Sequence, residues 1–378
     1  MNRELLDVFG LDPEVLHLNH GAFGCAPIAV RRAAEDWRNR AERNPHHFNG
    51  HQLPGLIAGA RHRVADFLQV DAEAVGFVRN VSEGVSSVFG SLDLRPGDEI
   101  VVCNHGYGAV TMAAQNWADR RGAAIRTAAF GVGADDETIV AAYAGECGPR
   151  TRLVIVDQIT SPTAMVLPVA AIANAVDAPV LADAAHVPGT LPVDIAGLGV
   201  AHWVGNLHKW CYTPRGTAVL WTVAGYRDRT YPATMNWQLN DGYAASFDYP
   251  GTWDYSGWLS AGDGLDFWSG LGGWQQIDRQ AAMLAEAQER VAARFGSSLQ
   301  GLPQRPAATM RLVPLPESHA GDRARELSGA LSEEYSIQVP VTSHDGRSYL
   351  RIAAAPYNTP DDYDRLADAV LELTEGCD

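Results

Sequence analysis

Lysine is almost absent from the sequence. Of its 29 basic residues, 28 are arginine and one, Lys209, is lysine. A GC-rich genome explains a general preference for arginine, but it does not explain why one lysine remains. Arginine stays protonated and cannot form an imine, whereas a lysine amine can. The remaining lysine is therefore the first candidate for covalent chemistry.

Several patterns that would indicate a membrane or nucleic-acid function are also missing. No apolar run approaches the roughly 18–20 residues needed to cross a bilayer. The first residues lack the basic-then-apolar pattern of a signal peptide. The net charge of −16 argues against a phosphate-backbone partner. We therefore expect a cytoplasmic protein without a membrane or nucleic-acid partner.

The cysteines show no paired spacing of the kind that builds a zinc site or a disulfide framework. They are Cys25, Cys103, Cys147, Cys211 and Cys377. We expect all of them to be reduced thiols. His46, His47 and His51 form a cluster by composition, but no second group of ligands accompanies them at a suitable spacing. We therefore expect no metal site.

Short β-type runs alternate with helical stretches over the first two thirds of the chain. Apolar residues at helical spacing predict a helix over 56–68, and Asn80 and Glu83 have the spacing of a capping box. Strands are expected at 75–77, 99–103, 153–157, 179–183, 202–206 and 217–221. This alternation predicts an α/β fold with a mostly parallel central sheet.

The last hundred residues have a different pattern. A stretch rich in Ala, Glu and Arg predicts one long helix over 275–295, and strands are expected at 311–314, 338–341 and 349–353. The expected organisation is an N-terminal segment (1–20), a large domain (21–274), and a connecting helix with a smaller α+β C-terminal domain (275–378).

Polar residues follow the expected strands at their carboxyl ends, where open α/β sheets bind ligands. Val81 and Ser82 open a helix whose N–H groups suit a phosphate, although an ordinary cap explains this turn equally well. Asp183 ends another strand, and by itself it could be a surface residue or a cap. Lys209 follows a further apolar strand, which favours a Schiff-base lysine. A nicotinamide-dependent dehydrogenase would need a glycine-rich fingerprint, which residues 80–84 do not provide.

A series of short motifs extends over nearly the whole chain. They are LNHGAFG at 18–24, NVSEG at 80–84, HGYGA at 105–109, TSPT at 160–163, DAAH at 183–186, NLHK at 206–209, PRG at 214–216, GTWD at 251–254, and Arg351 followed by YNT at 357–359. Their order and spacing resemble the class V aminotransferase family of pyridoxal 5′-phosphate (PLP) enzymes with the type I fold. Within that family the chain is similar to the isopenicillin N epimerase-like branch.

The resemblance implies PLP as cofactor and a role for each motif toward its ring. Lys209 matches the lysine that holds the cofactor as a Schiff base and moves the α-proton. Asp183 matches the acid that faces the pyridine nitrogen and keeps it protonated. His186 matches a partner of the 3-oxygen. Tyr107 matches the aromatic residue stacked on the ring, with His105 as the competing assignment.

Further roles implied by the resemblance concern the phosphate and the substrate. For the phosphate they are Val81, Ser82, Asn206 and His208, with Thr252 reaching over from the other subunit of a homodimer with shared active sites. For the substrate they are Arg351, which would pair with the α-carboxylate, together with Ser161, its neighbour Thr160, and Phe23.

The reaction is less determined than the cofactor. Related desulfurases carry a catalytic cysteine before the C-terminal arginine, and this chain has none from Leu302 to Arg351. We therefore expect a carbon–sulfur lyase that performs β-elimination on an S-substituted cysteine conjugate in sulfur or secondary metabolism. Decarboxylation-dependent oxidative deamination, epimerisation and transamination are the alternatives. A cofactor-binding regulator is disfavoured because no basic segment provides a DNA-binding module.

Tryptophans near the motifs suggest a roomy substrate pocket with aromatic walls, although half or more of them could belong to the core. They are Trp203, Trp210, Trp237, Trp253 and Trp258.

Overall fold

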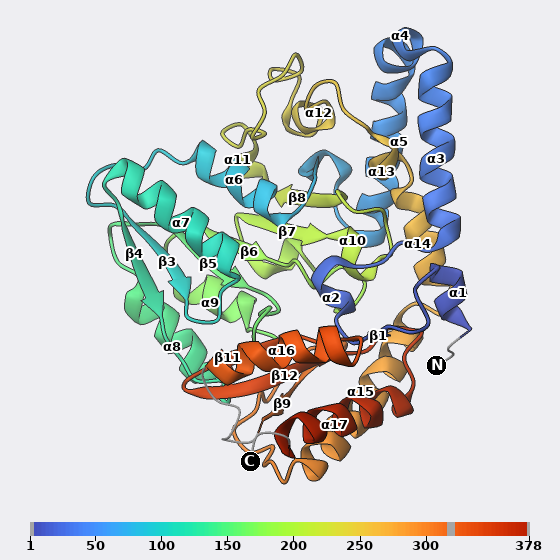
Figure 1. Cartoon of the computed structure of the whole chain (residues 1–378). Helices are drawn as coiled ribbons and strands as arrows, with labels where there is room; N and C mark the ends of the chain where they lie inside the picture. The colour runs from blue at the N-terminus through green and yellow to red at the C-terminus, as the bar shows by residue number, and fades with distance from the viewer. Residues whose placement is uncertain (1–3, 316–321, 376–378) are drawn as a thin grey trace.

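A seven-stranded sheet forms the centre of the protein (Figure 1). The computed structural model describes residues 4–315 and 322–375. In spatial order the strands are β2 (Val75–Val78), β8 (Ala218–Thr222), β7 (His202–Asn206), β6 (Val180–Asp183), β5 (Thr151–Asp157), β3 (Glu99–Cys103) and β4 (Ala124–Ala128). Within the described ranges, no helix is long and apolar enough to cross a bilayer.

The sheet is mostly parallel, as the sequence predicts. Strands β4, β3, β5, β6 and β7 run in one direction, and β8 is antiparallel to both β7 and β2. The edge strand β4 has no sequence signal, because only Ala128 among its residues is fully buried. The central strands are buried on both sides and therefore appear in the sequence as continuous apolar runs.

Helices pack on both faces of this sheet. One face carries α6 (Val81–Ser91), α7 (Gly108–Arg121) and α12 (Tyr243–Asp248). The other face carries α5 (Leu53–Leu68), α8 (Asp136–Glu146) and α9 (Val169–Ala175). The remaining helices of the large sheet and the N-terminal region are α1 (Leu5–Phe9), α2 (His20–Phe23), α3 (Ile28–Arg43), α4 (Pro45–His47), α10 (Leu207–Trp210), α11 (Ala224–Arg227), α13 (Ser256–Leu259) and α14 (Ala261–Gly270).

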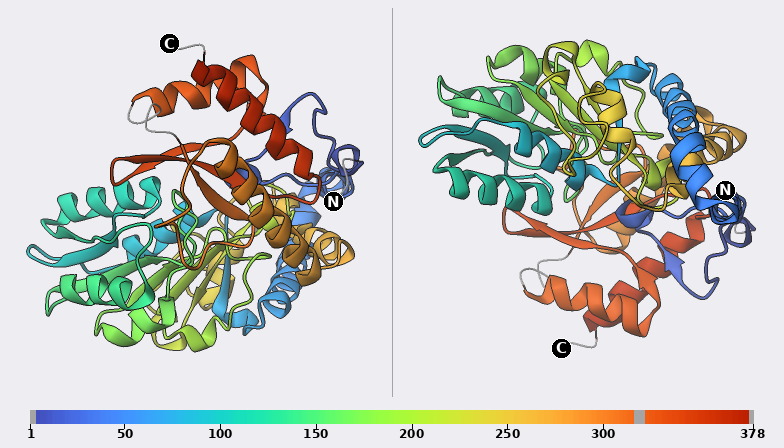
Figure 2. Two further views of the ribbon diagram at one scale, coloured as in Figure 1. Left: turned by 90° about the horizontal axis from the view of Figure 1, so that it is seen from below. Right: turned by 90° about the horizontal axis from the view of Figure 1, so that it is seen from above.

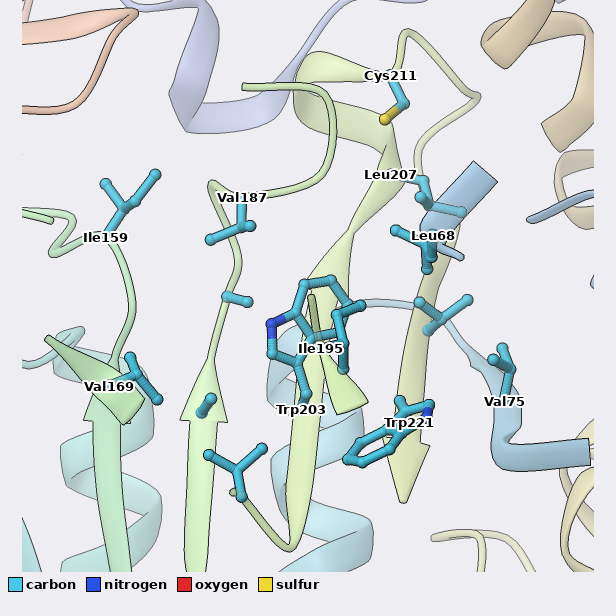
Figure 3. Packing of buried hydrophobic residues seen from close by; sticks show 14 of the residues in the cluster. Leu68, Val75, Ile159, Val169, Val187, Ile195, Trp203, Leu207, Cys211 and Trp221 are labelled. Carbon is cyan, nitrogen blue, oxygen red and sulfur yellow. The ribbon is translucent and has the colours of Figure 1, made fainter. Parts of the chain in front are cut away.

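Alternating side chains of the strands separate the two cores. In β5, Leu153 and Ile155 pack with α6 and α7, whereas Val154 and Val156 pack on the opposite face. Trp203 of β7 belongs to the second of these cores, where it lies among apolar side chains from several segments (Figure 3). Strand periodicity of two residues thus decides which helix layer each side chain contacts.

A smaller antiparallel sheet follows at the C-terminal end, in the order β11 (Val341–His344), β12 (Arg347–Ala353), β9 (Met310–Pro314). Its helices are α15 (Trp274–Arg294), α16 (Asp322–Glu334) and α17 (Pro360–Glu375). The strand expected at 338–341 is divided, since β10 (Ile337–Gln338) ends before Pro340 and β11 begins after it. Proline lacks the N–H needed to continue a ladder.

The N-terminal segment packs on these C-terminal elements. Strand β1 (Leu16–His17) pairs with β10, and Figure 2 shows the blue segment among the orange and red ones. After β1 the chain reaches Gly24, which has a φ of 63° and packs against the turn that follows β7. A Cβ atom on Gly24 would lie 1.8 Å from the carbonyl oxygen of His208. The chain just after the N-terminal segment therefore lies directly against His208, the residue before Lys209.

Gly24→Ala tests this close approach. Gly242 is a matched control because its φ of 97° and ψ of 168° lie in the same glycine-favoured region as the φ of 63° and ψ of 176° of Gly24, but a Cβ atom at Gly242 would have nothing within 4 Å. We expect Gly242→Ala to cost only the backbone strain of this region, about 1–3 kcal/mol. Gly24→Ala should cost more than about 4 kcal/mol, because backbone atoms must also move. Thermal and urea unfolding of the two variants measure the difference, and equal losses would contradict the contact.

Candidate active site

Three neighbouring parallel strands end together at one edge of the large sheet. β5 ends at Asp157 and β6 at Asp183, and these two residues are register partners. β7 ends at Asn206 and leads directly into α10, which carries Lys209. This edge is where open α/β sheets bind their ligands.

A cavity of about 180 Å³ lies at this edge. Its lining residues are Ala22, Phe23, Asn80, Val81, Ser82, Tyr107, Asp157, Ile159, Ser161, Asp183, Ala185, His186, Asn206, His208 and Lys209. The structure thus brings together most of the candidate site residues; His105, Thr160, Thr252 and Arg351 do not line the cavity. We call this cavity the cleft.

The amine of Lys209 is buried in the cleft. Its Nζ lies 3.1 Å from Nε2 of His186. Burial lowers the pKa of Lys209 to about 7; the nearby Asp183 opposes this shift, and Arg351 adds to it. Burial and the charge of Lys209 also hold the pKa of His186 well below its usual value, so this imidazole is neutral. Lys209 can therefore lose its proton near neutral pH, and the neutral amine is the form that makes a Schiff base.

Unpaired polar atoms around Lys209 fit the ring of PLP. Asp183 Oδ1 accepts a hydrogen bond from the N–H of Ala185 at 3.0 Å, but its buried Oδ2 has no partner in the described part of the chain. The same is true of Nδ1 of His186. Buried polar atoms are normally paired, so these two indicate a missing group. A protonated pyridine nitrogen would supply the donor that Asp183 lacks.

The N-terminus of α6 has a free site that suits a phosphate. The side chain of Asn80 accepts from the N–H of Glu83 at 2.9 Å, as the capping spacing predicts. The N–H of Val81 donates to Oδ1 of Asn206 at 3.0 Å. Asn206 thus fixes the start of the helix. The N–H and hydroxyl of Ser82 have no partner among the described residues, so they can bind an anion at the positive helix end.

Tyr107, and not His105, lines the cleft. The N–H of Tyr107 donates to Oδ1 of Asp157 at 3.0 Å, and its side chain is 43% exposed. His105 is fully buried, where its nitrogens contact the hydroxyl of Thr163 and the carbonyl of Phe130. Of the two residues, Tyr107 is the one that lies at the cleft, and its stacking on the ring stays a prediction.

The hydroxyl of Thr160 is occupied within its own loop. It bonds to the hydroxyl of Thr163 at 2.8 Å, and Thr160 is fully buried. Its neighbour Ser161 lines the cleft instead. Of the two residues expected to approach the ligand, only Ser161 is placed to do so.

Arg351 is a buried cation beside the cleft. Its guanidinium donates to the carbonyl and hydroxyl of Ser161 and, at 2.8 Å, to Oδ1 of Asn19. Burial lowers its pKa to about 10, so it remains charged at neutral pH. Its Nε has no partner in the described residues, and none of its guanidinium contacts there is a carboxylate. A buried guanidinium without a counter-ion is suited to bind a carboxylate of the substrate.

The prediction that tryptophans form the walls of the pocket is wrong. Trp203, Trp210 and Trp258 are fully buried in the core, and Trp253 packs against Trp258 with ring centroids 4.8 Å apart. Trp237 is 94% exposed. None of them lines the cleft. Their proximity to the motifs in sequence reflects core packing around the sheet.

Thr252 is exposed on this chain and lies outside the cleft. A role at the phosphate of a second subunit therefore stays a prediction.

Sequence reasoning missed Asp157, Asn19 and His20. Asp157 ends β5 as Asp183 ends β6, so the strand-end rule could have found it. Burial and the charge of Asp183 raise the pKa of Asp157 well above its usual value. Asn19 and His20 stand inside the LNHGAFG motif, but their partners, Arg351 and Lys209, lie far along the chain. No local pattern predicts those contacts.

Comparisons with known proteins agree on the family. The family model Aminotransferase class-V matches residues 28–366. Isopenicillin N epimerase of Amycolatopsis lactamdurans is 30% identical over 394 residues, which cover 97% of this chain and 96% of that protein. L-cysteine desulfhydrase of Arabidopsis thaliana is 27% identical over 409 residues, which cover 96% and 88%.

Solved structures agree on the fold. A structure of the lyase C-DES with glycine covalently linked to its PLP cofactor superimposes with a TM-score of 0.80 at 22% identity, and covers 96% of this chain and 98% of that one. The complex of the same cystine C–S lyase with its product, cysteine persulfide, gives a TM-score of 0.78 at 22% identity, with 94% and 96% coverage. The match over most of the sequence, the shared fold and the fit of the cleft to PLP lead to one conclusion: the chain belongs to the class V aminotransferase family of PLP-dependent enzymes.

Proposed function

We propose that the protein is a carbon–sulfur lyase that performs β-elimination on an S-substituted cysteine. The observation that carries this proposal is the set of groups at the cleft. A buried amine that titrates near neutral pH adjoins a buried cation, and no cysteine of the described residues lines the cleft. A desulfurase needs such a thiol to accept sulfur, whereas β-elimination needs only a base and a fixed substrate.

The residues of the cleft can perform this reaction in the following way. Bound PLP would supply an electron sink that weakens the bonds at Cα of the amino acid. Lys209, Asp183, His186 and Ser82 would hold it. Arg351 binds the α-carboxylate and aims the Cα–H bond at the amine of Lys209.

Lys209 then takes the proton from Cα, and neutral His186 keeps a hydrogen bond to its Nζ. The Cβ–S bond breaks, and its electron pair leaves with sulfur as a thiolate or sulfenate. Hydrolysis of the three-carbon remainder gives pyruvate and ammonia. The balance requires water but no oxidant.

The similarity to an L-cysteine desulfhydrase and to a cystine C–S lyase supports this assignment. Epimerisation is the second candidate, because an isopenicillin N epimerase is also similar and Tyr107 brings a phenol into the cleft. An epimerase needs a second acid, and Tyr107 is suited to that task. β-Elimination does not require it.

A product assay on the holoenzyme distinguishes the two reactions. We expect a panel of S-substituted L-cysteines to yield pyruvate, ammonia and the matching thiol or sulfenate in equal amounts. Tyr107→Phe should retain this activity, and Lys209→Ala should lose it. Exchange of the α-hydrogen with inversion, no pyruvate, and loss of the exchange in Tyr107→Phe would instead identify an epimerase. Release of carbon dioxide would indicate decarboxylation.

Arg351→Ala tests the carboxylate anchor. Removing one partner of a buried charge pair costs about 2–5 kcal/mol, and each 1.4 kcal/mol is about tenfold. We therefore expect KM for the amino acid to rise by about a hundredfold, while the visible absorbance of bound PLP is retained. Arg351→Lys should recover little, because an ammonium lacks the planar fork. Arg347→Ala, an exposed arginine on the same strand, is the control, and an equal effect there would remove the anchor role.

We propose further that the protein is a homodimer in which Thr252 reaches the phosphate of the other subunit. Mixing Lys209→Ala with Thr252→Asp chains should then restore activity, since the hybrid contains one site with both residues intact. Activity is measured after mass spectrometry has confirmed subunit exchange, with each parent treated alone as control. Confirmed hybrids without activity would contradict the shared site.

A further inference from the structure

His20 connects three parts of the chain that are distant in sequence. Its imidazole is buried, and Nε2 lies 2.8 Å from the main-chain carbonyl oxygen of Lys209. Nδ1 lies 3.0 Å from the hydroxyl of Tyr357, which follows the last strand of the small sheet. The imidazole also packs against Trp210, with ring centroids 4.9 Å apart.

The partners of His20 determine its tautomer. A carbonyl oxygen can only accept, so Nε2 must carry the hydrogen that it donates to Lys209. Burial lowers the pKa of His20 to about 4, so the ring is neutral at neutral pH and Nδ1 has no hydrogen. Nδ1 therefore accepts from the hydroxyl of Tyr357. The chain of hydrogen bonds runs in one direction, from Tyr357 through His20 to Lys209.

The two residues before His20 contact the small sheet and Arg351. Leu18 bonds to Gln338 and Ala353 through its main chain, at 3.0 and 3.1 Å. Asn19 accepts from the guanidinium of Arg351. Three consecutive residues thus bind, in turn, the small sheet, Arg351 and the main chain of Lys209.

We propose that His20 is a positioning residue for Lys209, which fixes the amine relative to Arg351 through the adjacent Asn19. The inference rests on the proposed roles of Lys209 as base and Arg351 as anchor. A substrate whose carboxylate is bound by Arg351 presents its Cα to the amine of Lys209 only if the two residues are held in a fixed relative position. The adjacent residues Asn19 and His20 contact one each. His20 does not line the cleft, and it acts through the main chain of Lys209.

His20→Ala removes the support and leaves Arg351 in place. A misplacement of about 1 Å can cost about a hundredfold in rate. We therefore expect kcat to fall by about that factor with little change in KM, and the pH midpoint of the PLP absorbance on Lys209 to move. His20→Gln keeps a donor near Nε2 and should recover part of both effects. Tyr357→Phe removes only the hydroxyl donor and should produce smaller changes of the same kind.

His202→Ala is the matched control. His202 is also buried, and it bonds to the hydroxyl of Thr222 at 3.1 Å, but it begins β7 at the end far from Lys209. We expect the kcat of His202→Ala and the pH midpoint of its PLP absorbance to match those of the wild type. If His20→Ala and Tyr357→Phe also match the wild type, the proposal is overturned. If His20→Ala does not fold, an unchanged midpoint and kcat in Tyr357→Phe overturn it.

Borohydride reduction of the wild type separates this inference from the proposed function. Label on the peptide that contains Lys209 supports the proposed role of Lys209, independently of the results with the His20 variants. Label elsewhere would remove the basis of both proposals.

Discussion

The burial of one amine is the constraint on which the rest of the site depends. Lys209 sits at the carboxyl edge of a parallel sheet, where burial favours its neutral form and Asp183 favours its charged form. A buried charge without partners is expensive, so such a group persists only where surrounding elements hold it. The turn after β7 is held by the packing of Trp210, by His20, and by the close contact of Gly24 with His208.

A buried cation near this amine comes from a different sheet. Arg351 belongs to β12, yet its guanidinium reaches Ser161 of the large sheet's loop and Asn19 of the N-terminal segment. In the proposed reaction, the relative position of the two sheets decides whether the carboxylate and Cα of one substrate molecule can be bound together. The N-terminal segment contacts Arg351 through Asn19 and the main chain of Lys209 through His20.

Buried polar groups in and beside the cleft lack hydrogen-bond partners among the residues that the structure describes. Oδ2 of Asp183, Nδ1 of His186 and Nε of Arg351 are buried without partners in the described part of the chain. Each such group costs stability in the protein alone, because its hydrogen bonds to water are lost. Cofactor and substrate would restore those bonds. Function thus accounts for local features that folding by itself would disfavour.

The sequence by itself determined the sheet and the main chemical groups. Strands buried on both faces must be apolar throughout, so β3 and β7 could be located to the residue, while the exposed β4 could not. The single lysine at a strand end favoured a Schiff base, and the order and spacing of the motifs along the chain, through their resemblance to a known family, implied PLP. Only the tertiary structure decided that Tyr107 lies at the cleft and His105 in the core, that Trp203 is buried, and that Asn19 contacts Arg351, 332 residues away. The reason is physical: periodicity and residue type act over a few neighbouring residues, whereas these contacts depend on how distant segments pack.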